Sequence, residues 1–308
     1  MQSNEIAPIV LFVYNRPWHT RKTIEALQKN ELACESELYI YADGAENDKV
    51  SQQVLQVRDY IKTIDGFKKI AIIERNRNWG LSASIIDGVT SIVDKCSKVI
   101  VLEDDHITSP YFLKFMNDSL EFYKDESKVW HISGWNYPAG IDSLDDVFLW
   151  RLMNCWGWAT WADKWQYFEK DTKKLMKEFS RADIKRFNLD GADNVWIQVI
   201  LNKYGYTDTW AVYWYATIFK NGGLCLNPIK SFIGNIGHDG SGSNCNDLSF
   251  KDNQVLNINN NVTFVANIHE DGKVVKQIQS HLEAINKSIL VKIVNKVARM
   301  IIKENLIK

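Results

Sequence analysis

Four short apolar runs alternate with amphipathic segments over the first hundred residues, and this alternation restricts the fold more than any other feature. We interpret the apolar runs as buried strands at residues 9–14, 38–42, 70–74 and 99–102. The segments between them have helical periodicity, at residues 20–29, 50–64 and 82–93. Strands that alternate with helices of this length predict βαβ units. The sequence therefore predicts an α/β fold with a doubly wound, mostly parallel sheet.

Polar residues follow each of the four predicted strands. They are Arg16, Asp43, the pair Arg75 and Arg77, and the acidic triplet Glu103, Asp104 and Asp105. Ligands of open α/β sheets bind outside the carboxyl ends of the strands, so these side chains are expected to converge on one site. A divalent cation or a polyhydroxy ligand would relieve the repulsion within the triplet, although a solvated acidic turn is the alternative. The two arginines of the third loop precede a predicted helix, where they could bind phosphate or simply face water.

Composition and short motifs exclude several classes of protein. The net charge is −1 and the pI about 6.6, so nothing attracts the chain to nucleic acid. The five cysteines are widely spaced and predict neither a disulfide framework nor a zinc site. No signal peptide and no run of about 20 apolar residues is evident, and we expect a cytoplasmic protein. Neither a dinucleotide-binding glycine motif nor a P-loop lysine motif is present.

Five blocks of sequence carry a resemblance to a known family. Residues 101–115 (VLEDDHITSPYFLKF) and 130–136 (WHISGWN) resemble the GT-A glycosyltransferases related to N-acetylglucosaminyltransferase I. They are closer to bacterial family 2 sugar transferases that build surface polysaccharides such as O-antigen or capsule, which residues 156–161, 219–224 and 235–240 also resemble. The likeness covers about residues 7–245. It implies a GT-A fold and the inverting transfer of a sugar from a nucleotide diphosphate sugar, expected to be UDP-linked, to a glycan or lipid-linked oligosaccharide acceptor.

The resemblance also implies roles for the acidic triplet and for a late loop. Asp105 would bind Mn²⁺ or Mg²⁺ on the diphosphate of the donor, while Asp104 and Glu103 would bind hydroxyls of the ribose or donor sugar. His238 would close over the diphosphate or the metal, although a histidine in a glycine-rich loop can equally be a surface residue. Oxygen ligands suit these ions, and the ion would stabilise charge on the departing nucleotide diphosphate.

Other residues are candidates for substrate recognition. The resemblance implies that Arg16 and Asp43 hold the nucleotide base, which is expected to be uracil. In the second half of the chain, tryptophans could stack on sugar faces, or they could be core residues, since each buries a large apolar area. The four tryptophans concerned are Trp135, Trp156, Trp158 and Trp210.

The chain departs from the family at the catalytic base. The relatives carry Trp-Asp followed by a second tryptophan, whereas residues 209–214 of this chain read TWAVYW, so that Ala211 occupies the expected position. An inverting transfer needs a carboxylate to accept the proton of the attacking hydroxyl. Three explanations remain: a natural or engineered loss of the base, a substitute such as Asp208 or Asp193, or a misplaced alignment. We favour loss, because the flanking tryptophans align without a gap.

The predicted organisation is one GT-A domain with an extension. We expect residues 1–132 to form the nucleotide-sugar-binding half, residues 133–245 the acceptor and catalytic half, and residues 246–308 the extension. Residues 256–266 alternate weakly and predict an edge strand. Residues 171–189 predict a solvated helical face.

The end of the sequence predicts an amphipathic helix. Apolar residues recur at helical spacing between residues 284 and 308. The residues on its other side are Lys292, Lys296, Arg299 and Lys303. This pattern favours peripheral contact with the inner face of the cell membrane, with packing on the domain or a dimer contact as alternatives.

Two other functions remain open. A sugar-phosphate nucleotidyltransferase also uses a parallel sheet and an acidic metal site, but it needs a glycine-rich basic loop after the first strand, where this chain reads Asn-Arg-Pro. The alanine at position 211 also makes a non-catalytic nucleotide-sugar-binding or glycan-binding protein credible.

Overall fold

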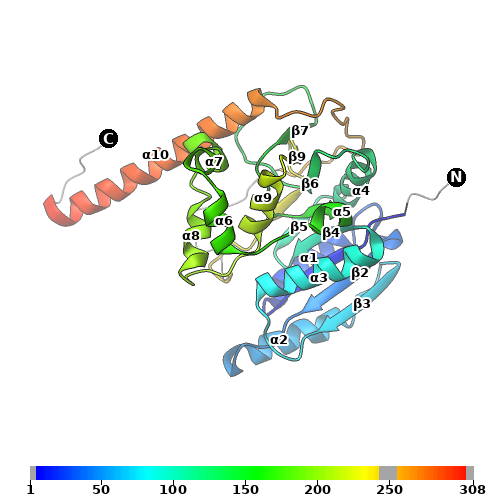
Figure 1. Cartoon of the computed structure of the whole chain (residues 1–308). Helices are drawn as coiled ribbons and strands as arrows, with labels where there is room; N and C mark the ends of the chain where they lie inside the picture. Colours follow the sequence, from blue (N-terminus) through cyan, green and yellow to red (C-terminus); the bar gives the residue numbers. More distant parts are fainter. Residues whose placement is uncertain (1–4, 243–254, 303–308) are drawn as a thin grey trace.

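The computed structural model describes residues 5–242 and 255–302, with the backbone alone for residues 288–302. Its centre is an eight-stranded sheet in the order β3-β2-β1-β4-β8-β6-β9-β7 (Figure 1). The strands are β1 (Ile9–Val13), β2 (Glu37–Ala42), β3 (Lys69–Glu74), β4 (Lys98–Glu103), β6 (Val129–Ser133), β7 (Val147–Trp150), β8 (Trp158–Trp161) and β9 (Leu224–Pro228). Only β7 and β8 run against the others, so the predicted α/β fold with a mostly parallel sheet is confirmed. The arrangement is consistent with a GT-A fold.

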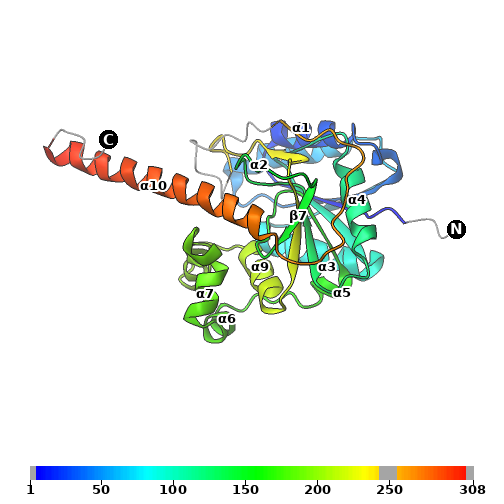
Figure 2. The same ribbon diagram turned by 90° about the horizontal axis from the view of Figure 1, so that it is seen from above.

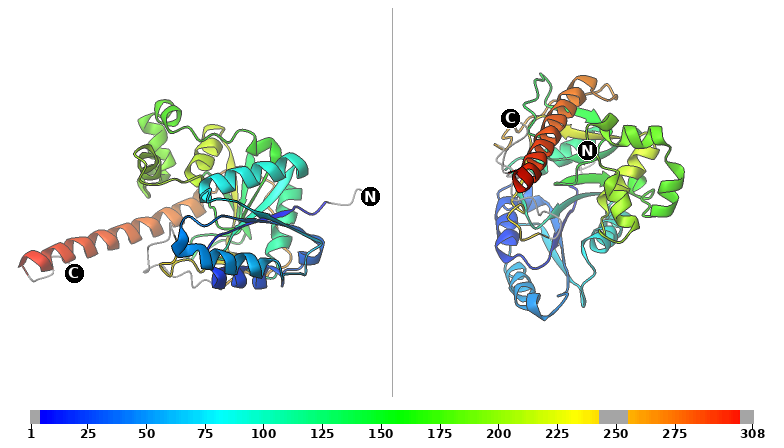
Figure 3. Two further views of the ribbon diagram at one scale, coloured as in Figure 1. Left: turned by 90° about the horizontal axis from the view of Figure 1, so that it is seen from below. Right: turned by 90° about the vertical axis from the view of Figure 1, so that its left-hand side faces the viewer.

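Helices cover both faces of this sheet. They are α1 (Pro17–Leu27), α2 (Asp48–Ile61), α3 (Leu81–Cys96), α4 (Phe112–Phe122), α5 (Ala162–Trp165), α6 (Thr172–Glu178), α7 (Arg181–Phe187), α8 (Ile197–Lys203) and α9 (Ala211–Lys220), with short 3₁₀ turns at Ala33–Glu35 and Leu189–Gly191. Alternate residues of β1 point to opposite faces: Ile9 and Leu11 pack with α1, α2 and α4, whereas Val10 and Phe12 pack with α3. Figure 3 shows α3 and α9 on the other side of the sheet from α1 and α2.

Local chemistry explains where the first helices begin. Pro17 is the first residue of α1, a position that needs no N–H donor. The side chain of Asn47 caps α2 by accepting a hydrogen bond from the Lys49 N–H at 3.1 Å. The N-cap of α3 is Gly80 with φ 76°, a conformation that favours glycine. These starts place the N-termini of α1 and α3 beside the carboxyl ends of β1 and β3.

Two predictions about elements are wrong. The pair Ser109-Pro110 is typical of a helix start, with serine as the cap and proline as the first helical residue. Helix α4 instead begins at Phe112, because Ser109 makes a turn in which its Oγ accepts the Tyr111 N–H at 3.2 Å. Residues 256–266 form no strand. They are extended chain held by side-chain packing, in which Phe264 lies against α4 and the Tyr123 hydroxyl donates to the Val265 carbonyl at 2.9 Å.

The two predicted halves share one sheet, because β8 pairs with β4 across its middle. The final described element is α10 (Gly272–Ile302), whose first turns belong to the core: Val274, Val275, Ile278 and Leu282 are buried there. Farther along the helix, α10 leaves the body of the protein and extends away from it (Figures 1 and 2).

Candidate functional site

A cavity of about 230 Å³ opens at the carboxyl ends of β1, β2 and β4. The sheet reverses its winding at β1, with β2 on one side and β4 on the other, and this is the point where open α/β sheets bind ligands. The polar and charged residues that line the cavity are Asn15, Arg16, Asp43, Glu46, Asn78, Ser84, Glu103, Asp104, Asp105 and Ser241. The structure therefore brings together the predicted groups of three of the four strand ends.

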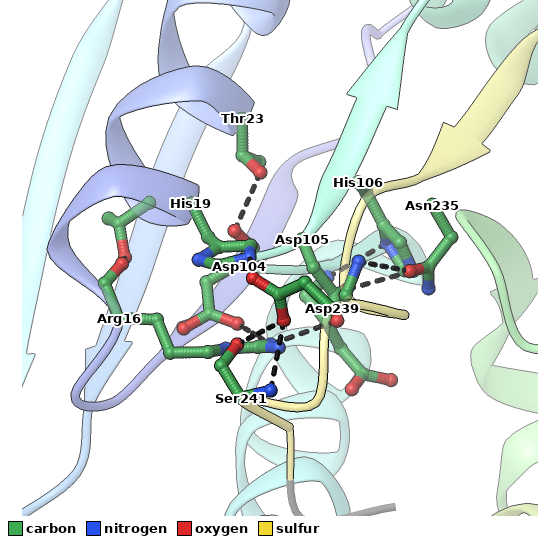
Figure 4. Close-up of polar contacts among 12 residues, drawn as sticks. Arg16, His19, Thr23, Asp104, Asp105, His106, Asn235, Asp239 and Ser241 are labelled. Carbon is green, nitrogen blue, oxygen red and sulfur yellow. Dashed lines mark hydrogen bonds and ion pairs between the residues drawn. The ribbon is translucent and has the colours of Figure 1, made fainter. Parts of the chain in front are cut away.

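Arg16, Asp104 and Asp105 line this cavity and form a buried charge cluster (Figure 4). Arg16 Nη2 donates to Asp104 Oδ1 and, at 2.9 Å, to Asp105 Oδ2. The side chains of Arg16, Asp104 and Asp105 are only 14%, 6% and 6% exposed. The guanidinium is thus engaged by the acids, whereas the sequence predicted that it would hold a nucleotide base.

Burial changes the proton affinity of the acids. Glu103 is the last residue of β4, and desolvation together with the charges of Asp105 and Asp104 raises its pKa to about 8. Desolvation also raises the pKa of Asp104, against the lowering effect of Arg16. The raised pKa favours the protonated form of the Glu103 carboxyl, which can donate a hydrogen bond to a ligand hydroxyl as well as accept one.

Asp105 keeps one buried oxygen without a hydrogen bond. Oδ1 has no hydrogen-bond partner among the described residues, and His106 Nε2 lies 3.7 Å away. His106 Nδ1 accepts the Glu103 N–H at 3.0 Å, and burial lowers the pKa of this ring to about 4, so the imidazole is neutral. A buried carboxylate oxygen without a partner fits a hard divalent cation.

The protein supplies few ligands of its own to such an ion. In the part of the chain that the structure describes, no group of three or more His, Cys, Asp or Glu side chains is arranged to hold a metal. Asp105 would therefore be one ligand of Mn²⁺ or Mg²⁺, and a bound diphosphate would have to provide others. This is how Mg²⁺ is commonly bound, through one or two carboxylates and substrate phosphates.

The loop after β10 (Ile233–Asn235) lies directly on Asp105. β10 pairs with β5 (His106–Thr108), and the Ile236 N–H donates to the Asp105 carbonyl at 2.9 Å. A Cβ on Gly237 would collide with the Asp105 carboxylate, so only glycine permits this approach. The next residue, His238, packs edge-on against Trp156 with ring centroids 5.5 Å apart. The predicted His238 thus packs on Trp156 and directly follows the glycine that approaches Asp105.

Two residues that the sequence reasoning missed fasten this loop to α1 (Figure 4). His19 Nε2 lies 3.1 Å from Asp239 Oδ2, and Asp239 Oδ1 accepts the Ser241 N–H at 2.9 Å and its hydroxyl at 2.6 Å. His19 stands three residues after Arg16, one helical turn along the chain. That spacing, together with the Gly-His-Asp-Gly block, was the feature of the sequence that could have indicated the contact between His19 and Asp239.

Asp43 joins the end of β2 to the start of α3. Its carboxylate accepts the N–H groups of Gly44, Trp79 and Gly80, each at 2.9 Å. It also lines the cavity, where it is 8% exposed. Asp43 therefore orders the part of the cavity wall between β2 and α3, and only its remaining acceptor capacity is open to a ligand.

The arginines after β3 do not line the cavity. Arg75 is paired with Asp87, and its guanidinium lies 3.9 Å from the centre of the Trp79 ring, a cation–π contact. Arg77 is exposed, and its backbone packs against Gly44. Their placement favours the alternative to a phosphate cradle, in which one arginine braces the loop and the other faces water.

Trp158 and Trp210 lie in the core. They are 1% and 3% exposed, and their rings stack on each other with centroids 5.0 Å apart. Covered rings cannot stack on a sugar, so their burial favours the packing alternative. Trp156 is the partly exposed tryptophan beside His238.

None of the three positions considered for the catalytic base lines the cavity. Ala211 is the first residue of α9 and packs, partly buried, against the aromatic core. Asp193 is partly buried, and its Oδ1 accepts the Asn194 N–H. Asp208 is 73% exposed and pairs with Lys170.

Lys170 links Asp208 to the start of α3. Its Nζ also donates to Ser82 Oγ at 2.6 Å. Ser82 lies in the first turn of α3, between cavity-lining residues Leu81 and Ser84. Of the three positions, Asp208 is thus connected to the rim of the cavity.

Comparisons with known proteins add little beyond these observations. No family model and no curated protein matches the chain. Among solved structures, TarS of S. aureus matches 41% of this chain and 21% of its own length, at 16% identity and a TM-score of 0.29. A CMP:2-keto-3-deoxy-manno-octonic acid synthetase bound to CTP matches 72% and 88%, at 11% identity and a TM-score of 0.35. Within the described residues, no helix is both long and apolar enough to cross a membrane.

Proposed function

We propose that this protein is an inverting, metal-assisted glycosyltransferase that takes a sugar from a nucleotide diphosphate donor, with UDP as the nucleotide. The observation that carries the proposal is the buried Oδ1 of Asp105, which has no hydrogen-bond partner within the described residues. Asp105 lines a cavity at the carboxyl ends of parallel strands, and the other acids and Asp43 line the same cavity. The family resemblance agrees with these positions.

The residues of this site would bind different parts of the donor. Asp105 would hold Mn²⁺ or Mg²⁺, which when bound would supply positive charge to the departing diphosphate. Protonated Glu103 and the Asp104 carboxylate would bind donor hydroxyls. The loop at Gly237 and His238 would cover the diphosphate and keep water out. Arg16, already on the acids, would face the diphosphate and contribute charge, a role different from base recognition.

The acceptor hydroxyl also needs a base, and Ala211 cannot supply it. A general base contributes on the order of 10² to 10⁴ in rate. Ala211 lies at the start of α9, outside the lining of the cavity, so an acceptor that uses this position as its base must bind beside that helix end. We expect Ala211→Asp to raise sugar transfer by about that factor while donor affinity stays unchanged. The assay is UDP release from UDP-hexoses and UDP-N-acetylhexosamines with Mn²⁺ and a lipid-linked oligosaccharide fraction. Lys220→Asp, at the far end of α9, is the matched control.

Rapid turnover by the unchanged chain would contradict the loss of the base. If Asp208→Asn or Asp193→Asn then abolished turnover, the base would lie at that residue. Asp208 is the first to test, because Lys170 connects it to the cavity rim at Ser82.

The same assays separate the two other functions. A sugar-phosphate nucleotidyltransferase would release pyrophosphate from a nucleoside triphosphate and a sugar phosphate. A binding protein would take up UDP-sugar with Mn²⁺ and catalyse neither reaction, even after Ala211→Asp. The loop between β1 and α1 carries no glycine-rich segment for a triphosphate, and this favours the glycosyltransferase.

The acceptor is proposed to be a growing bacterial surface glycan on a lipid carrier, which requires the protein to work at the inner face of the membrane. The first turns of α10 are held to the body: Gln279 Nε2 donates to the Leu189 carbonyl and Asn286 Nδ2 to the Ala192 carbonyl, each at 3.0 Å. Beyond residue 287 the helix extends away from the body (Figure 2), and there the sequence alternates apolar residues with Lys292, Lys296 and Arg299. A basic amphipathic helix of this kind suits an anionic lipid surface.

A further inference from the structure

The Arg16 guanidinium lies against the acidic residues and supplies a positive charge to them. Its Nη2 is shared between Asp104 Oδ1 and Asp105 Oδ2, while its Nη1 is buried and makes no hydrogen bond within the described residues. The guanidinium thus has one nitrogen on the acids and one still available. Both neighbouring acids are almost fully buried, so solvent screens this arrangement little.

The backbone of Arg16 is fixed, and only its side chain can adjust. Its carbonyl accepts the Thr20 N–H at 3.0 Å and the Thr20 hydroxyl at 2.9 Å, as the first turn of α1 requires. On the other side, Gly237 packs directly against the Asp105 carboxylate and lies close to Arg16 Nη1. Arg16 and Asp105 both line the cavity, so a ligand that enters it approaches these two side chains from the same side.

We propose that Arg16 acts as an internal counter-ion that keeps a divalent cation off Asp105 until a nucleotide diphosphate enters the cavity. A bare Mn²⁺ at Asp105 Oδ1 would lie beside a buried guanidinium of the same sign, and the two would repel each other. A diphosphate changes this balance, because its oxygens coordinate the ion and also accept a hydrogen bond from Arg16 Nη1. Metal and nucleotide would then bind cooperatively, with the coupling carried by one side chain. This inference rests on the proposed function.

The test is a Mn²⁺ titration followed by electron paramagnetic resonance of the free ion, with and without UDP. The variants are Arg16→Met, which removes the charge but keeps the length, and Arg16→Lys, which keeps the charge. A buried acid pair left without a cation can destabilise the fold, so the double variant Arg16→Met with Asp104→Asn is included. It removes one charge of each sign and leaves the net charge of the cluster unchanged.

For the unchanged protein we expect weak Mn²⁺ binding that UDP strengthens at least tenfold. Arg16→Met and the double variant should bind Mn²⁺ alone at least tenfold more tightly than the unchanged protein, and UDP should strengthen that binding less. Arg16→Lys should behave like the unchanged protein. Equal Mn²⁺ affinity in the unchanged protein and both methionine variants, measured without UDP, would overturn the inference, and so would the absence of Mn²⁺ binding in every variant.

The same experiment distinguishes this inference from the proposed function. If UDP binds to none of the proteins at millimolar concentration, the proposed donor is wrong. The comparison of Mn²⁺ affinities without UDP still decides whether Arg16 excludes the ion.

Discussion

The two halves of the sheet use their side chains in opposite ways. Around β1 to β4 the strand interiors are apolar and the charged groups lie at the strand ends, where Arg16, Asp43 and the acids meet in one cavity. Around β6 to β9 the aromatic residues fill the interior, and rings such as Trp158 and Trp210 cover each other. In this protein, the position of a residue at the end or in the interior of a strand indicates better than its residue type whether it lines the cavity or belongs to the core. Polar residues after three of the four strands line the cavity, whereas the density of tryptophan indicated the core.

The buried histidines follow the same division. His106, in the acidic half, accepts the Glu103 N–H and lies beside Asp105. His131, in the aromatic half, has its Nε2 2.9 Å from the Asn154 carbonyl, and its Nδ1 accepts the Trp214 indole N–H at 3.2 Å. One ring borders the site, and the other is a fully satisfied part of the core.

The largest effect on stability is expected from truncating α10, and two truncations that end at different positions separate its two parts. Deleting residues 272–308 removes four buried apolar side chains, each stabilising by about 1.5–3 kcal/mol, and their sum of about 6–12 kcal/mol is comparable to the stability of a whole domain. Cooperative thermal melting should disappear. Deleting residues 288–308 should leave melting intact and release the protein from anionic vesicles in a sedimentation assay. Loss of melting in the shorter deletion would mean that the end of α10 belongs to the fold, and the membrane proposal would be wrong.

Trp158→Ala should destabilise the aromatic half without touching the cavity. Truncating a buried tryptophan costs about 3–5 kcal/mol, measured as the free energy of unfolding in urea. Trp18→Ala is the control, because Trp18 is 57% exposed and its replacement should change stability by about 0.5 kcal/mol or less. UDP affinity of the folded fraction should be unchanged in both variants. A Trp158→Ala protein of normal stability that has lost ligand binding would instead support the sugar-stacking role.

The burial of His131 should make the stability of the protein depend on pH, and this effect is smaller than the previous two. Burial lowers its pKa to about 3, from an ordinary value of 6.5, so between these values the unfolded chain binds the proton and the folded chain does not. Stability is therefore fully present above pH 6.5 and falls as the pH decreases, by up to about 1.4 kcal/mol for each pH unit. Subtracting the unfolding free energies of His131→Gln at pH 7, 6 and 5 isolates this contribution from the carboxylates. A difference that does not change with pH would show that His131 becomes protonated in the folded state.

Much of the fold follows from local signals in the sequence. Apolar runs placed β1 to β4 within one residue of their observed ends. For β1 and β4 the reason is burial on both faces, which leaves little choice for such segments. The sequence contains no comparable signal for contacts between residues that are far apart in the chain. The pairing of Arg16 with Asp104 joins residues 88 positions apart, and the approach of Gly237 to Asp105 depends on the β5–β10 pair.

The errors have the same cause. Residues 256–266 alternate like a strand, but no sheet edge accepts them, and they pack through side chains instead. Whether a tryptophan is covered depends on its neighbours in space, which its sequence position does not reveal.

The measurement that tests the account most directly is calorimetry of UDP-sugar binding in Mn²⁺ for the unchanged protein, Asp105→Asn and Asp118→Asn. Asp118, on α4, is the matched control, because it pairs with Lys114 at 2.7 Å and does not line the cavity. Loss of the proposed metal ligand should weaken the donor affinity of the folded protein by about 10-fold to 100-fold or more, while the Asp118→Asn affinity stays unchanged. Equal donor affinity in all three proteins would contradict a metal-assisted nucleotide-sugar site at the carboxyl end of β4.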